Sequence, residues 1–301
     1  MSVPLYIPTF NNPTYTTNFI NQVDEMNFSK IIIMDNNSTY PPMIKLLKEL
    51  QSKHEVIRLD ENLGPHLILR NPEYYKSLPE VFALSDPDVE FPRDLSPGFQ
   101  KSLIDIGIKH RVGKVGFAIE VPKENEFLEL IVNLDGKLRN MHEWEQQFWE
   151  NEIDRTSSGD PIFLTTLDTQ FAIYNKEFFN PEDRYKALRI GGKYTSKHLG
   201  FYKKSIVPQE ESDFYRSVSK YAYFKYAYFI GNFDENGIPY TKLPVHSYYQ
   251  LTERLEGAER ELKRVTFERD KYLTELDQFY KSNSWKILSL LLKIKKIMRV
   301  K

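Results

Sequence analysis

Short apolar runs alternate with amphipathic stretches along the first ninety residues of the chain. The runs are rich in β-branched residues, as buried strands are, and the stretches between them repeat apolar residues at helical spacing. Strands that alternate with helices form a mostly parallel sheet with helices on both faces, so we expect an α/β fold. The predicted strands are Val3–Ile7, Lys30–Met34, Glu55–Leu59 and Glu80–Leu84, and the predicted helices are about 14–26, 43–50 and 66–76.

The pattern between residues 93 and 248 is less regular. It predicts a helix at 96–110, a strand at Lys114–Val121 and a helix at about 210–227. The segment 162–174 is rich in β-branched and aromatic residues, and Asp168 interrupts it. A carboxylate inside such a segment needs either a partner or a chemical role.

A heptad pattern in residues 249–281 predicts a coiled-coil helix. Its core positions alternate at spacings of four and three from Leu251 to Phe279, with one break at Arg269. Such a helix is expected to project from the body or to pair with a second copy in a homodimer. The alternative is an amphipathic helix packed on its own domain.

Charge is distributed unevenly along the chain. The chain carries 41 Lys and Arg against 42 Asp and Glu, a net charge of −1, yet residues 281–301 hold seven basic residues and no acidic one. The remaining residues therefore carry 34 basic and 42 acidic groups. A cationic amphipathic segment binds at an anionic membrane surface. The segment 282–301 is predicted to be a basic amphipathic tail that docks on a membrane or a partner, the alternative being a terminal helix that covers the core.

Composition excludes several kinds of site. The chain has no cysteine, which excludes disulfides, thiolate zinc sites, iron–sulfur clusters and cysteine nucleophiles. No stretch approaches the roughly 20 apolar residues that span a bilayer, and residues 1–10 lack the pattern of a secretory signal. An acidic body without a long basic stripe argues against nucleic acid as a ligand. We expect a cytoplasmic protein that is peripheral on the inner face of the cell membrane.

Polar or turn-forming clusters follow four successive predicted strands, at the carboxyl ends where open α/β sheets bind ligands. They are Pro8–Asn11, Asp35–Ser38, Asn62–Pro65 and Asp86–Asp88. In the last cluster, two carboxylates two residues apart can converge on Mg²⁺ or Mn²⁺, which prefer oxygen ligands. The alternative for that cluster is an Asx turn, because Asp and Asn are also common turn residues.

The other clusters suit a nucleotide. Asp35 can accept hydrogen bonds from a ribose or a base, and Asn62–Pro65 can bring backbone amides near a phosphate. The sequence lacks G-x-G-x-x-G and G-x-x-x-x-G-K, which argues against a dehydrogenase and a phosphate-loop hydrolase. A nucleotidyltransferase stays open as an alternative, since it could use similar carboxylates.

Four sequence stretches, PLYIPTFNN, IIIMDNNS, ENLGP and LSDPDVEF, resemble in this order the glycosyltransferases of family 2 and related GT-A enzymes. Three later stretches, DTQFAIYNK, RIGGKYTSKHLGFY and SNSWKI, resemble bacterial cell-surface polysaccharide glycosyltransferases. The resemblance covers most of residues 2–205 and is specific in the first ninety. It implies a Rossmann-like GT-A domain at 1–248, with a nucleotide-sugar half at 1–92 and an acceptor half at 93–248.

The resemblance also implies the site residues and a divalent cation, Mn²⁺ or Mg²⁺. Asp86 and Asp88 would form the metal-binding DXD motif, with Asp88 as the preferred direct ligand. His198 is the preferred further ligand, because it follows a Gly-rich basic loop, and His246 is the alternative. The residues implied to bind the nucleotide sugar are Pro8, Thr9, Asn11, Asp35, Asn37, Asn62, Gly64, Asp86 and Lys193.

Inversion at the anomeric carbon needs a carboxylate base near the acceptor hydroxyl. Asp168 is the preferred base, and Glu210 and Glu211 are the alternatives. The stereochemistry of the transfer stays open.

The expected function is transfer of a sugar from a nucleotide-diphosphate sugar, in the first place a UDP-sugar. The acceptor would be a glycan or lipid-linked glycan in bacterial cell-surface polysaccharide synthesis. The non-enzymatic alternative is a membrane-docked coiled-coil scaffold with a degenerate nucleotide-binding body.

Overall fold

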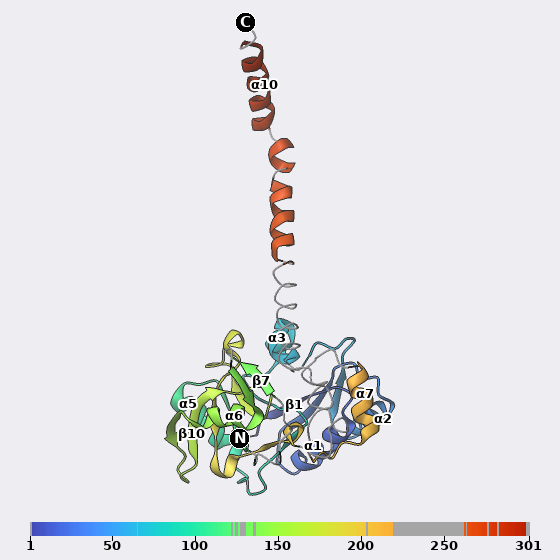
Figure 1. The fold of residues 1–301 in the computed structure, drawn as a ribbon, viewed down its shortest axis with the longest axis vertical. Coiled ribbons are helices and arrows are strands. Elements are labelled where there is room, and N and C mark those ends of the chain that lie inside the picture. The colour runs from blue at the N-terminus through green and yellow to red at the C-terminus, as the bar shows by residue number, and fades with distance from the viewer. Residues whose placement is uncertain are drawn as a thin grey trace. The chain divides into compact units, whose positions relative to one another are not determined.

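The computed structural model divides into two compact units, Met1–His246 and Ser247–Lys301. Each unit is described by itself (Figure 1). The described residues are 2–64, 66–121, 123, 126, 131–134, 137–202, 204–218, 262, 264–275, 277–281 and 283–298.

A sheet of nine strands, counted over the described residues, forms the centre of the first unit, in the order β3-β2-β1-β4-β11-β6-β12-β10-β9. Strands β3, β2, β1 and β4 pair in parallel with one another, whereas β11 and β10 run antiparallel to both of their neighbours. Because β6 and β12 pair in parallel, seven of these nine strands point the same way. The predicted mostly parallel α/β sheet is thus confirmed. The strand bounds are β1 Pro4–Thr9, β2 Lys30–Asp35, β3 Glu55–Arg58, β4 Val81–Leu84, β6 Lys114–Phe117, β9 Glu152–Arg155, β10 Pro161–Thr166, β11 Ala172–Asn175 and β12 Lys186–Ile190.

Helices cover both faces of this sheet. The alternation of side chains along β2 sends Ile31 and Ile33 to one apolar core and Ile32 and Met34 to the other. Burial on both faces explains the continuous apolar run in this strand. The first core includes residues of α1 Pro13–Val23, α2 Pro41–Leu50 and α5 Phe99–His110, and the second includes residues of α3 Leu67–Arg70.

The second face has short helices, α3 with four residues and α4 Pro72–Ser77 with six. A single helix was expected at 66–76. Pro72 disfavours the helical conformation at Asn71 and lacks an N–H, so the helix is interrupted there. The Asn71 side chain then accepts hydrogen bonds from the backbone of Glu73 at 3.0 Å and Tyr74 at 3.2 Å, which caps α4.

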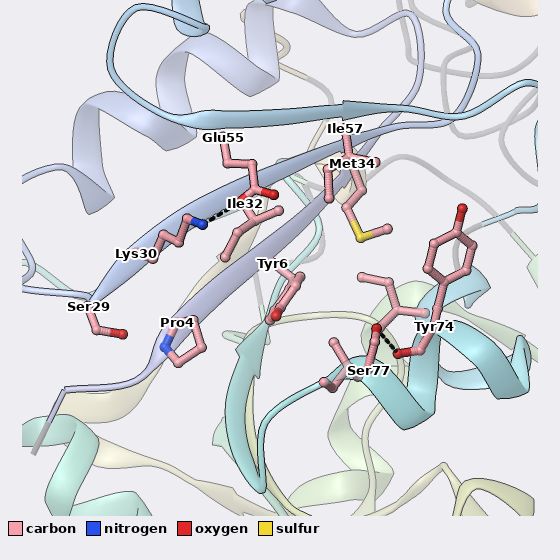
Figure 2. A pocket seen from close by; sticks show the side chains of 12 residues that line it. Pro4, Tyr6, Ser29, Lys30, Ile32, Met34, Glu55, Ile57, Tyr74 and Ser77 are labelled. Atoms are coloured by element: carbon pink, nitrogen blue, oxygen red, sulfur yellow. Dashed lines mark hydrogen bonds and ion pairs between the residues drawn. The ribbon is translucent and has the colours of Figure 1, made fainter.

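A cavity of about 400 Å³ lies between α3, α4 and this face of the sheet. Figure 2 shows the Lys30–Glu55 ion pair beside the side chains of Ile32 and Met34. Since Lys30 and Glu55 begin their strands, this cavity reaches the amino ends of β2 and β3. The polar clusters of the sequence follow the opposite, carboxyl ends.

The segment after β6 contains small elements. The predicted strand Lys114–Val121 ends at Phe117, and Ile119 then forms an isolated bridge with Ser196. The predicted helix at 210–227 begins as α7, and residues 219–227 lie outside the described part of the chain. The remaining elements of this unit are β5 Val89–Glu90, β7 Ile131–Leu134, β8 Lys137–Asn140, α6 Met141–Gln146, η1 Gln147–Trp149, η2 Pro181–Asp183, η3 Gly192–Tyr194, β13 Lys197–His198, η4 Leu199–Phe201 and α7 Gln209–Val218.

The second unit is helical at 264–275, at 277–281 and in α10 Asn283–Met298. Of the predicted heptad positions, those from Leu251 to Ala258 and Leu276 lie outside the described residues. Val265 and Tyr272 are described and exposed. Over the described residues, none of the helices combines the length and the apolar character needed to cross a membrane.

Candidate functional site

The carboxyl ends of β2, β1 and β4 lie side by side, so the loops that follow these strands share one edge of the sheet. Asn11 joins the first two loops. Its backbone N–H donates to Ser38 Oγ at 2.8 Å, and its Oδ1 accepts from the amides of Thr39 and Tyr40 at 2.7 and 2.8 Å. The Asn11 Nδ2 and the Thr9 Oγ1 are buried and have no hydrogen-bond partner. Strand β1 ends with Pro8 and Thr9, two residues before Asn11.

Asp35 is completely buried at the end of β2. Its carboxylate accepts from the Ser38 amide at 3.2 Å and from Arg58 Nε at 3.0 Å. This ion pair explains how a buried charge is tolerated there. The contacts of Asp35 with Ser38 and Arg58 also stabilise the conformation of the loop that follows β2.

Asn36 connects the Asp35 loop to the next one. Its Oδ1 accepts from the Leu63 amide at 3.1 Å and its Nδ2 donates to the Gly64 carbonyl at 3.2 Å. By contrast, Asn37 is half-buried, and its side chain donates to the Asp60 carbonyl at 2.9 Å. Asn36 was missed in the sequence because any of the residues in Asp35–Ser38 could have faced inward.

Asn62 and Gly64 form a tight turn. Asn62 Oδ1 accepts from the Gly64 amide at 2.9 Å, and Gly64 has φ of 84°, a conformation that favours glycine. Pro65 lies outside the described residues.

Asp86 follows β4 and is held by the loop between β10 and β11. Its carboxylate accepts from Thr169 Oγ1, and its amide donates to the Thr169 carbonyl at 3.0 Å. Burial and the nearby charge of Asp88 raise the pKa of Asp86 well above its usual range. Two acidic groups crowded in this way are expected where a cation binds, because the cation would relieve the repulsion.

Asp88 and His198 come together through a short ladder. Strand β5 pairs with β13, with Val89 opposite His198, and the Asp88 carbonyl accepts from the Leu199 amide at 2.7 Å. This pairing brings His198 Nε2 to 3.5 Å from Asp88 Oδ2. The His198 ring stacks on Phe201, with centroids 4.0 Å apart, which fixes its orientation.

The same pair has unused coordinating atoms. Asp88 and His198 are 6% and 8% exposed, and Asp88 Oδ1 and His198 Nδ1 are buried without a hydrogen-bond partner. Buried polar atoms rarely lack partners unless an ion or water supplies one. A Cβ at Gly200 would lie 3.2 Å from Asp88 Oδ2 and from His198 Cε1, so glycine keeps this space open.

These residues fit the protein's share of a Mg²⁺ or Mn²⁺ site. Among the described residues, there is no group of three or more His, Cys, Asp or Glu that could hold a metal ion. One carboxylate and one imidazole would therefore have to be completed by water and by oxygens of a diphosphate. This is how Mg²⁺ is usually held in such sites. His246, the alternative ligand, lies outside the described residues.

Asp168 lies in the β10–β11 loop and is paired with His66. The distance from His66 Nε2 to Asp168 Oδ1 is 3.1 Å, and the Asp168 side chain is 58% exposed. Desolvation works against ionisation of Asp168, but the hydrogen bond and charge of His66, together with the charges of Lys114 and His198, outweigh it and lower the pKa of Asp168. His66 directly follows the Asn62–Pro65 turn, and this adjacency was the signal that could have identified it.

Two other candidates lie in separate interactions. Lys193 donates its amide to Asp160 Oδ1 at 3.0 Å and its Nζ to Ser158 Oγ at 2.7 Å. Glu211 is 3% exposed, and its carboxylate accepts from the Thr14 amide at 3.2 Å and Thr14 Oγ1 at 2.6 Å. Both groups are thus engaged with neighbours other than Asp86, Asp88 and His198.

Comparison of the sequence with protein-family models and with curated proteins gave no match. Comparison of the fold with solved structures gave distant likenesses, among them GT-A-type glycosyltransferases. GalNAc-T7, crystallised with UDP, GalNAc and Mn²⁺, has a TM-score of 0.41 at 12% identity, over 68% of this chain and 46% of that one. Residues 1–349 of TarS from S. aureus give 0.38 at 14%, over 76% and 70% of the two chains. A mycobacterial protein gives 0.40 at 12%, over 72% of each. The chain spans less than half the length of the GalNAc-T7 chain.

Proposed function

We propose that the chain is a metal-dependent glycosyltransferase that uses a nucleotide-diphosphate sugar, in the first place a UDP-sugar. The observation that carries this proposal is the buried pair of Asp88 and His198, whose Oδ1 and Nδ1 atoms lack partners. It lies next to Asp86, whose pKa is raised by burial and by the nearby charge of Asp88. Such a site calls for a cation with a polyanionic ligand.

The roles of the residues follow from their positions. Asp88 and His198 would hold Mn²⁺ or Mg²⁺, with Asp86 acting directly or through water. When bound, the cation neutralises charge on the departing nucleotide diphosphate. The unpartnered Thr9 Oγ1 and Asn11 Nδ2 would bind the nucleotide, along the loop that Asp35 shapes. The remaining donor-binding residues in the proposal are Pro8, Asn37, Asn62, Gly64 and Lys193, the last only if its contacts with Asp160 and Ser158 rearrange.

Asp168 is the proposed base. Its exposed, ionised carboxylate would take the proton of the acceptor hydroxyl while that oxygen bonds to the anomeric carbon. The bond from the anomeric carbon to the diphosphate oxygen breaks in the same step, and the nucleoside diphosphate leaves with the electron pair. The lowered pKa of Asp168 keeps it ionised, although it also makes the carboxylate a weaker base.

The acceptor in this proposal is a glycan or lipid-linked glycan of bacterial surface polysaccharide synthesis. The enzyme would meet it at the inner face of the membrane, with 282–301 as the docking tail. The helix 249–281 would serve as a spacer or as the seam of a homodimer. Val265 and Tyr272, which lie on the predicted seam, are exposed, and this supports a seam that is apolar and open at these two positions.

Binding of UDP with and without Mn²⁺, measured by thermal shift and calorimetry, tests the metal site. Asp88→Ala and Asp86→Ala should each weaken Mn²⁺-dependent UDP binding by at least about tenfold. Asp94→Ala, an exposed aspartate in the same segment, is the matched control and should bind like the wild type. A ligand that binds the folded state raises the midpoint with its occupancy, so a panel of nucleotide sugars identifies the donor. UDP binding that is independent of metal, or unchanged in both variants, would contradict the site.

A further inference from the structure

Lys114 is a buried cation without a carboxylate partner. It lies in β6 and is 1% exposed; none of the described carboxylates is within ion-pair distance of it, and the charges of Asp168 and Asp86 act on it from further away. Its Nζ donates to the carbonyl oxygens of Leu167 at 2.5 Å, Asp168 at 2.7 Å and Arg184 at 3.0 Å. The ammonium also lies 5.4 Å from the centre of the Tyr174 ring.

Such a placement is costly. Burial lowers the pKa of Lys114 to about 7, since desolvation disfavours the charged form. An apolar side chain of similar volume in the sheet would avoid that cost. The three carbonyl oxygens offset it, because an ammonium is the side-chain group that offers three N–H donors from one point. The reason for a lysine at this position is therefore to be sought in the segments to which the three carbonyl groups belong.

Two of the three carbonyls belong to the loop 167–171, which connects β10 to β11. This loop lies against β6, because a Cβ at Gly116 would be 2.3 Å from the Phe171 carbonyl oxygen and 2.4 Å from Leu167 Cδ2. The Leu167 amide further donates to the Tyr185 carbonyl at 2.7 Å. The loop backbone is thus fixed from the strand side, with Lys114 as its anchor.

The same loop holds two groups of the candidate site. Asp168 accepts from His66 at 3.1 Å, and Thr169 binds Asp86 through both its hydroxyl and its carbonyl. A shift of the loop backbone would therefore move the proposed base and one carboxylate of the DXD motif together. Misplacement of reacting groups by about 1 Å can lower a rate by about a hundredfold.

We propose that Lys114 is a positioning residue of the active site, which acts through the loop 167–171 on Asp168 and Asp86. The effect on the reaction rests on the proposed glycosyltransferase function. The hydrogen bonds by which Lys114 holds the loop backbone, called the clamp below, are a property of the fold alone. Lys114 itself contacts no substrate in this role.

Lys114→Met keeps the length of the side chain and removes the donors. Lys176→Met is the matched control, because Lys176 also donates to backbone carbonyls, of Leu78 and Lys76, and lies 5.1 Å from a tyrosine ring, but holds no part of the loop. In the first variant, the amide hydrogens of 167–170 should exchange at least about tenfold faster. In the control their exchange should be unchanged.

Kinetics separates positioning from loss of stability. With the UDP-sugar identified by the thermal-shift panel, Lys114→Met should lower kcat by about tenfold to a hundredfold and leave KM for the donor within about threefold. Thr169→Val breaks the contact with Asp86 further along the same path. If Lys114 acts through the loop, adding Lys114→Met to Thr169→Val should lower kcat less than it does in the wild type, because the route to Asp86 is already broken while that to Asp168 remains.

Several outcomes would overturn the proposal. These are unchanged exchange of 167–170 in a folded Lys114→Met protein, an unchanged kcat, or additive effects in the double variant. If Lys114→Met does not fold, Lys114→Gln, which retains two donors, should show a smaller change in exchange and kcat, and no change would count equally against the clamp. A wild-type protein that neither binds nor hydrolyses a nucleotide sugar would refute the proposed function, while the exchange measurement would still decide whether the clamp exists.

Discussion

Three aspartates at the candidate site have three different partners. Asp35 is neutralised by Arg58, Asp86 accepts from a hydroxyl group, and Asp168 is paired with His66. For two of them the surroundings shift the pKa, since burial beside another acid raises the pKa of Asp86 while positive neighbours lower that of Asp168. The pKa values of Asp86 and Asp168 consequently shift in opposite directions. This holds although the residue that binds Asp86, Thr169, directly follows Asp168 in the same loop.

His66→Gln should move the acid limb of the pH profile of kcat/KM to higher pH. The substitution removes the positive neighbour that lowers the pKa of Asp168, so the proposed base would be protonated at a higher pH. His54→Gln, which removes a histidine paired with Asp24 at 3.2 Å outside the site, should leave the limb in place. A limb that stays where it is in His66→Gln would argue against Asp168 as the base.

The same pair affects stability in a defined direction. The pKa of Asp168 is lower in the folded state than in the unfolded chain, so its contribution to stability is present above the usual aspartate pKa. That contribution is lost as the pH falls through the lowered value. Because the side chain is 58% exposed, solvent screening makes the effect small.

At the scale of elements, α7 is anchored to the start of α1 by Glu211. The backbone donors at the start of a helix need acceptors from outside the helix, and Asn12 makes no side-chain cap at the start of α1. Glu211 supplies the missing acceptor from a distant part of the chain, and a carboxylate also suits the positive end of the helix dipole. Stacking of Phe214 on Tyr40, with centroids 4.6 Å apart, extends the contact to the start of α2.

Glu211→Ala should lower the free energy of unfolding by about 1–3 kcal/mol, because it leaves Thr14 without its acceptor. The exposed neighbour offers a control, since Glu210→Ala should change the stability very little. Urea unfolding at neutral pH measures both. Equal effects of the two substitutions would show that α7 is not anchored in this way.

Burial also raises the pKa of Glu211, so the folded state disfavours its carboxylate. Stability should therefore decrease as the pH rises from the usual glutamate pKa through the raised value. Glu211→Gln should remove this dependence, because an amide does not titrate in that range.

At the scale of the whole molecule, an acidic body is joined to a basic end. The side chains of Ile287 and Leu290 in α10 are 61% and 59% exposed, and residues 281–301 include seven basic groups and no acidic one. Exposed apolar side chains beside lysines suit the interface of an anionic membrane. The distribution of charge, and not the net charge of −1, carries this proposal.

Deletion of 282–301 should release the protein from anionic liposomes in a co-sedimentation assay. Donor hydrolysis should be unchanged, because Asp88, His198 and Asp168 lie in the other compact unit. Liposomes of neutral lipid are the control and should bind neither form well. Undiminished binding of the truncated protein to anionic liposomes would exclude the tail as the docking segment.

The sequence by itself determined the layers of the fold and the edge of the sheet on which polar groups gather. Apolar runs such as Lys30–Met34 predict buried strands because side-chain alternation and burial are local properties. The break at Asn71–Pro72 also has a local cause in Pro72, but the sequence pattern predicted one continuous helix there. The resemblance in the first ninety residues predicted in addition that this edge binds a nucleotide sugar and a divalent cation.

The tertiary structure alone decided which polar side chains meet. Asp88 faces His198 because a two-residue ladder joins β5 to β13, and Asp168 meets His66 because the β10–β11 loop crosses toward the start of α3. Lys193, close to His198 in sequence, is instead bound to Asp160. Such contacts depend on strand order and loop path, which are set by packing across the whole sheet. No local pattern of residues encodes them, and so Lys114 could be recognised as an anchor only once the carbonyls around it were known.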